Sequence, residues 1–107
     1  MLYELRINDA VPGKLPALHD RFAKTSIPYF EKYGIKVIGF WTDEVGFSNR
    51  LQFILGFENA DHYERAWSSF RTDPERIKAY AATETDGPLV IRVTNTLMRP
   101  TAYSPLQ

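Results

Sequence analysis

Two short runs of β-branched and aromatic residues, at positions 35–42 and 51–57, constrain the fold of this chain more than any other feature. The cluster from Gly46 to Asn49 between them is rich in turn-forming residues, so the pattern predicts a β-hairpin. One face of such a hairpin would be strongly apolar and would need a cover. The residues that share this face by alternation are Val37, Trp41, Leu51, Phe53, Leu55 and Phe57.

Each end of the chain carries one further strand pattern. Residues 2–8 alternate, with Tyr3, Leu5 and Ile7 on the face expected to be buried under helices. Residues 89–99 alternate in the same way, and Pro100 ends the run. The sheet is therefore expected to have four strands.

Helical periodicity fills the two connections. Residues 14–33 carry an apolar stripe with a spacing of three or four, and Pro28 predicts a kink or break near Ile27 before Gly34 caps the end. A second helix is expected to begin at Asn59 or Asp61. A third is expected to begin after the capping residue Asp73.

The element order β, α, β, β, α, α, β in 107 residues predicts a single α+β domain spanning 1–107. Its fold class is a ferredoxin-like four-stranded antiparallel sheet with helices on one face. The helix-free face is too apolar for full solvation, so we expect it to pair with a second copy of the chain, Glu4 matching Arg6 or Arg92 of the partner. The residues expected on that face are Leu2, Glu4, Arg6, Phe40, Gln52, Ile54, Arg92, Thr94 and Met98.

Composition argues against several classes of partner. The 13 basic and 13 acidic residues are interspersed and balance to zero net charge, which disfavours nucleic acid and anionic membranes. The chain has no Cys, and its two His lack the spacing of a metal motif, so we expect no metal. No run reaches the roughly 18 apolar residues of a membrane span, and the chain opens directly into a strand pattern, which favours a cytoplasmic location.

Several short motifs together resemble the NIPSNAP family of the dimeric α+β barrel superfamily. They follow one another in the expected order over nearly the whole chain: Tyr3-Glu4-Leu5-Arg6, Pro12-Gly13-Lys14-Leu15, Gly39-Phe40-Trp41, Leu97-Met98-Arg99-Pro100 and Ser104-Pro105-Leu106. The resemblance implies a ferredoxin-like domain that forms a barrel by pairing its sheet with that of a second subunit. Relatives in the superfamily include cofactor-free oxygenases, lactone isomerases, haem-degrading enzymes and haem peroxidases, whereas the NIPSNAP branch supplies no catalytic motif to carry over.

The candidate site residues are a histidine, a group of aromatics and an arginine. His19, at the edge of the first helix face, is the candidate catalytic base, although a boundary position also explains it. Arg99 is a candidate carboxylate ligand, as are the strand residues Arg6 and Arg92, for which ion pairing between subunits is the simpler interpretation. The residues expected to line a ligand pocket, or else an ordinary aromatic core, are Tyr3, Trp41, Phe53, Trp67 and Tyr80.

Two functional hypotheses follow. The first is a homodimer that binds or transforms a small aromatic or polycyclic molecule between sheet and helices, without a cofactor, as an oxygenase or isomerase would. The second is a non-catalytic interaction module that docks partners through the tail from Tyr103 to Leu106 and through exposed helix surfaces. Haem binding or degradation, with His19 as the iron ligand, is a third option.

Overall fold

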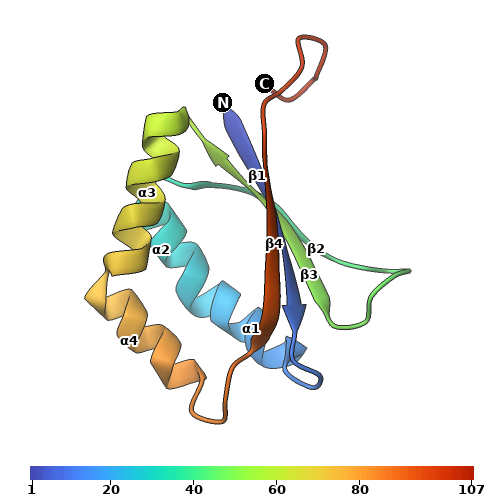
Figure 1. The fold of residues 1–107 in the computed structure, drawn as a ribbon, viewed down its shortest axis with the longest axis vertical. Coiled ribbons are helices and arrows are strands. Elements are labelled where there is room, and N and C mark those ends of the chain that lie inside the picture. The colour runs from blue at the N-terminus through green and yellow to red at the C-terminus, as the bar shows by residue number, and fades with distance from the viewer.

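The hairpin lies in a sheet of four antiparallel strands that is covered by helices on one face only (Figure 1). The computed structural model describes residues 1–107. The strands are β1 (Leu2–Ala10), β2 (Lys36–Thr42), β3 (Arg50–Phe57) and β4 (Val90–Met98), in the spatial order β2-β3-β1-β4. This order and the alternation of strands with helices are those of a ferredoxin-like α+β fold, as the sequence predicted.

The first helical segment runs without interruption through its proline. It consists of α1 (Leu15–Arg21), the π-helical turn η1 (Phe22–Ser26) and α2 (Ile27–Lys32). Pro28 has no N–H to donate, and the turn before it widens so that the Ile27 N–H donates to the Phe22 carbonyl. The predicted irregularity at Ile27 is thus a π turn, and Gly34, at φ 71°, closes the segment as expected.

The two remaining helices begin at the predicted caps. Asn59 accepts a hydrogen bond from the His62 N–H at the start of α3 (Ala60–Thr72). Asp73 accepts from the N–H groups of Glu75 and Arg76 at the start of α4 (Pro74–Thr83). The His62 ring accepts from the Glu58 N–H and faces the Tyr33 carbonyl, so this histidine joins α3 to the end of α2.

The first strand presents the opposite face to the helices from the one that we predicted. The indole N–H of Trp67, on α3, donates to Glu4 at 2.8 Å, so Glu4 faces the helices and alternation turns Leu5 and Ile7 away from them. The prediction assumed that the more apolar side of β1 faces the helices. In the structure, that side lies on the helix-free face. The polar side of β1 lies beneath the helices, where Trp67 provides a partner for the carboxylate.

The second strand changes its phase at a bulge. Val37 pairs with Leu55 but Gly39 pairs with Ile54, which leaves Ile38 as an extra residue. Beyond the bulge, Phe40 faces the helices and Trp41 faces away, the reverse of our prediction. Leu2, Glu4, Arg6 and Phe40 therefore leave the predicted helix-free set, whereas register keeps its other members there: Gln52, Ile54, Arg92, Thr94 and Met98.

Aromatic rings make up much of the core between β3 and the helices. Phe53 lies at its centre, and its ring stacks on Phe40 at 4.6 Å and meets the edge of Phe22 at 5.0 Å. Phe30 joins this group to Trp67 and Phe70 of α3. The packing is dense around β3 and becomes looser toward β4, where the candidate site lies.

Candidate functional site: a polar cleft between helices and sheet

Helix α4 packs against the first helix rather than against the sheet. The Tyr80 hydroxyl is hydrogen-bonded to Ser26, and a guanidinium nitrogen of Arg21 pairs with Glu84 at 3.2 Å. As a result, Val93 and Leu97 remain 44% and 46% exposed on the helix side of β4. A cavity of about 170 Å³, the helix–sheet cleft, opens here, and its walls include Arg6, Asn8, Arg21, Phe53, Trp67 and Tyr80.

One wall of the cleft is an ion pair surrounded by donors. Glu4 is fully buried, and its oxygens accept from Trp67 at 2.8 Å, Arg6 at 2.9 Å and Asn95 at 2.9 Å. The Arg6 guanidinium lies over the Trp67 ring, 4.7 Å from its centre. Because three donors already occupy Glu4, this carboxylate orients its neighbours and is a poor choice for a free base.

Two further buried residues of the cleft, one on α1 and one on β1, have polar atoms that lack partners. The Arg21 side chain is only 8% exposed, and it uses Nη1 to reach Thr83 and Glu84. Its Nε has no hydrogen-bond partner, and neither has the side-chain oxygen of Asn8, itself 6% exposed. Because buried donors and acceptors in proteins are almost always satisfied, two residues with such atoms beside one cavity mark the cleft as the candidate site.

Tyr80 is the titratable group of the cleft that stands between two cations. The guanidinium carbons of Arg21 and Arg76 lie 4.4 Å and 4.7 Å from its ring centre. Burial raises the pKa of the Tyr80 phenol, while Ser26 and the arginines act in the opposite direction. The phenol is therefore neutral at physiological pH and can donate a hydrogen bond or a proton.

The residues proposed from the sequence fall into three places rather than one. Phe53, Trp67 and Tyr80 line the helix–sheet cleft. His19 and Trp41 line an outer hollow of about 360 Å³ beside β2, separated from the cleft by Phe22, which borders both.

Tyr3 and Arg99 lie elsewhere, in a tail hollow of about 290 Å³ that also includes Leu106. There the Tyr3 hydroxyl donates to the Gln107 carbonyl at 3.1 Å, so the C-terminal tail folds back on its own chain. This separation follows from the face that β1 presents and from the bulge in β2. Both features turn residues away from the helices that parity had placed beneath them.

Arg21 and Asn8 were absent from the residues proposed from the sequence. Arg21 follows Leu18 by three positions, so it lies on the apolar stripe of the first helix, and a charge on such a stripe was the signal available. Asn8 gave no comparable signal, because its burial depends on which face β1 presents to the helices. Arg6 was considered, and it belongs to the cleft rather than to an interface ion pair.

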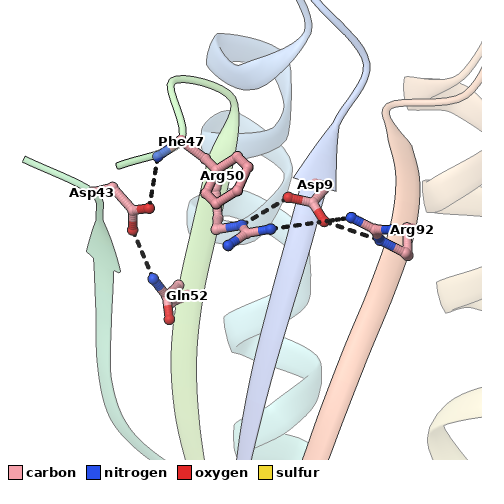
Figure 2. A network of polar contacts seen from close by, with 6 residues as sticks. All are labelled: Asp9, Asp43, Phe47, Arg50, Gln52 and Arg92. Carbon is pink, nitrogen blue, oxygen red and sulfur yellow. Dashed lines mark hydrogen bonds and ion pairs between the residues drawn. The ribbon is translucent and has the colours of Figure 1, made fainter. Parts of the chain in front are cut away.

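The helix-free face carries a different polar group at one end. Asp9 is shared by Arg50, at 2.8 Å, and Arg92, at 3.1 Å, and these contacts hold the pKa of Asp9 below its usual value. Figure 2 shows this network across three strands, with helices behind the sheet. Asp43 accepts from the Phe47 N–H and from Gln52 in the adjoining turn, which lowers its pKa as well. All these carboxylates are satisfied within the chain.

No helix in this structure is both long and apolar enough to cross a bilayer. No group of three or more His, Cys, Asp or Glu side chains is arranged to hold a metal ion.

Solved structures share this architecture at low sequence identity. Protein Atu4242 from Agrobacterium tumefaciens superposes with a TM-score of 0.86 at 23% identity, over 100% of both chains. An uncharacterised NIPSNAP domain protein from Burkholderia xenovorans gives 0.85 at 20% identity, over 98% of this chain and 99% of that one. A more distant neighbour is a mutant of MhuD with two manganese protoporphyrin IX molecules bound per active site, at 0.64 and 14% identity over 94% of each chain.

No functionally curated protein matches the sequence. The model of the NIPSNAP family, in contrast, matches residues 3–105. The match includes all four strands and every helix that frames the helix–sheet cleft. The chain belongs to the NIPSNAP family.

Proposed function

We propose that this protein is a homodimer that binds a small aromatic molecule in the helix–sheet cleft of each subunit. The observation that carries this proposal is the pair of unsatisfied buried polar atoms on Asn8 and Arg21, two residues that line a largely aromatic cavity. Ligand sites typically combine apolar walls with a few convergent polar groups. The cleft has this composition. The outer hollow is also mostly apolar, but none of its lining residues has a buried polar atom without a partner, and the tail hollow is formed in part by the chain's own C-terminus.

The volume of the cleft selects for a single ring. An apolar cavity of about 150 Å³ takes up benzene, and the cleft offers about 170 Å³. A porphyrin, with four pyrrole rings, is much larger than this volume, so the cleft favours a single-ring ligand over haem. The distant likeness to MhuD is a likeness of fold alone. A ligand longer than one ring would have to pass Phe22 to reach His19, our candidate base, in the outer hollow.

The helix-free face supports the homodimer. Its centre is apolar, and Trp41 is 52% exposed there in the single chain. Monomeric proteins rarely leave such a patch uncovered, and a two-fold axis lets one patch cover its own copy. The residues that register places on this face include Leu5, Ile7, Trp41, Ile54 and Met98. We expected Glu4 to pair with Arg6 or Arg92 of a second subunit. Instead, Glu4 forms its ion pair with Arg6 of its own chain.

The alternative of an interaction module has weaker support. The tail that would dock a partner instead contacts Tyr3, although its Tyr103 and Leu106 remain 88% and 46% exposed. Binding of a small molecule accounts for the unsatisfied groups of the cleft, which a tail-mediated interaction leaves unexplained. The cytoplasmic location expected from the sequence stays a prediction.

Binding can be read from the protein's own tryptophans. Trp41→Phe leaves Trp67, in the cleft wall, as the only tryptophan, and titration with benzyl alcohol should change its emission saturably. Trp67→Phe leaves only Trp41, outside the cleft, and should give no saturable change. Emission that responds equally in both variants would contradict binding in the cleft.

Two matched substitutions on one strand locate the bound molecule. In the Trp41→Phe background, Val93→Phe adds a ring to the wall of the cleft and should weaken benzyl alcohol at least about ten-fold. Leu97→Phe makes a similar change on the same face of β4, away from the cavity, and should leave the affinity within about two-fold. Equal effects of the two substitutions would count against the proposal.

A further inference from the structure

The hydrogen-bonding inventory of Arg21 specifies the chemistry of the ligand further. Nη1 is occupied by Thr83 and Glu84, at 3.3 Å and 3.2 Å, whereas Nε has no partner. The remaining edge of the guanidinium, formed by Nε and Nη2, offers two parallel N–H donors. This is the geometry in which arginine binds a carboxylate through two hydrogen bonds.

The charges around the cleft favour an anion. Arg6, Arg21 and Arg76 lie in or beside it, and Glu4 and Glu84 oppose them. Three cations against two carboxylates leave an excess of positive charge around the cleft. Such a site attracts an anion, although the net charge of the whole chain is zero.

The aromatic residues that line the rest of the cleft favour an organic anion with a ring over an inorganic anion. Phe53, Trp67 and Phe70 present rings to the cavity, and these surfaces gain from covering an aromatic molecule. Asn8 adds one acceptor without a partner, its side-chain oxygen. A hydroxyl group on the ring of the ligand could donate a hydrogen bond to this oxygen.

We propose, resting on the proposed function, that the cleft recognises a monocyclic aromatic carboxylate. The carboxylate binds the free edge of the Arg21 guanidinium, and the ring lies among the aromatic side chains of β3 and α3. A hydroxybenzoate, whose hydroxyl can reach Asn8, satisfies both unpartnered atoms of the wall. Arg6 contributes charge at the side of the cavity while remaining paired with Glu4.

The first test compares benzoate with benzyl alcohol in the Trp41→Phe protein, followed by Trp67 emission. The two molecules have nearly the same size, so benzoate should bind at least ten-fold more tightly because of its carboxylate. Equal affinity would overturn the carboxylate inference and leave the proposed function standing. Saturation by neither molecule would overturn both.

Substitutions at Arg21 assign the contact. Arg21→Lys keeps the charge but loses the two-donor edge, so benzoate affinity should fall about ten-fold further than benzyl alcohol affinity does. Arg65→Gln removes a charge from an exposed position on α3 and should change neither affinity by more than two-fold. Benzoate affinity that is equally insensitive to both substitutions would overturn the assignment. The comparison of ligands on unaltered Arg21 holds even where Arg21→Lys does not fold.

The hydroxyl contact is tested by comparing 3-hydroxybenzoate and 4-hydroxybenzoate with benzoate. At least one of them should bind several-fold more tightly than benzoate, and Asn8→Leu should remove that advantage. If both hydroxybenzoates bind no better than benzoate, the role assigned to Asn8 is wrong.

Discussion

On the helix-covered face of the sheet, Asn8 and Arg21 are buried with polar atoms that have no partner, whereas on the helix-free face Asp9 is shared by Arg50 and Arg92. Satisfied ion pairs occur on both faces, because Glu4 and Arg6 form one on the helix-covered side, but the buried polar atoms without a partner lie on that side alone. Satisfied ion pairs at the end of an apolar patch suit contact between subunits. Unsatisfied polar groups inside an aromatic cavity suit the binding of a small molecule.

The largest effect should come from removing the buried carboxylate of the cleft. Glu4→Ala leaves the Arg6 guanidinium and the Trp67 N–H without their acceptor and should cost about 3 to 5 kcal/mol of stability. Asp9→Ala, the matched change on the helix-free face, should cost about 1 kcal/mol, because its arginines stay partly solvated. Urea unfolding at one protein concentration measures both, and equal losses would remove the contrast between the faces.

The next effect concerns association. Ile54→Arg places an unpaired charge at the centre of the helix-free face and should weaken the dimer about 100-fold. Ile77→Arg makes the same change at an exposed position on α4 and should have no effect on association. Sedimentation velocity across a concentration series distinguishes the two, and a chain that is monomeric before any substitution would contradict the role of this face.

Lowering the pH should weaken the carboxylate contacts on the helix-covered side more than those on the helix-free face. Hydrogen bonds from Tyr33 and Lys32 lower the pKa of Asp73 far below its ordinary value, and this carboxylate joins α4 to the end of α2. Its contribution is complete above the unfolded pKa, near 4, and is lost as the pH falls toward the lowered folded value. Asp73→Asn should therefore destabilise the protein at pH 7 and flatten its stability profile below pH 4.

The corresponding change on the helix-free face is Asp9→Asn, which should flatten the profile less, because Asp9 and its two arginines stay partly solvated. Thermal unfolding followed by circular dichroism from pH 2 to 7 compares the two variants. A steeper loss of stability in acid for Asp73→Asn than for the unaltered chain would contradict the assignment.

The smallest effect is expected at His19. Because Phe22 separates His19 from the cleft, His19→Gln should leave the affinity for a single-ring ligand within two-fold. The titration of Trp67 emission measures it. A loss of ten-fold or more would mean that the two cavities act as one site and that His19 contacts the ligand.

Sequence patterns predicted the order and type of the elements, because strand alternation, helix caps and the position of Pro28 are local features. They were wrong about which residues of β1 and β2 face the helices. Tyr3, Leu5 and Ile7 are the more apolar set of β1, and the rule that apolar residues face the helices assigned them to the wrong side. That rule assumes that only one face is apolar, whereas in this sheet the helix-free face also carries apolar residues.

The bulge at Ile38 could not be found by counting positions, although Gly39 marks the place. A Cβ at Gly39 would lie 2.7 Å from the Trp41 ring, so the glycine is what allows Trp41 to cover that part of the helix-free face. The cleft was only partly predictable for the same reason. Trp67 and Phe53 belong to elements whose phase was right, while Arg6 and Asn8 depend on the phase of β1.

The most direct test of the two-faced sheet is a crystal structure grown in the presence of benzoate. We predict density for the carboxylate at the Nε edge of Arg21, and a second subunit covering Ile54 and Trp41 across a two-fold axis. Benzoate bound on the helix-free face, or that face left open to solvent in the crystal and in solution, would contradict the account.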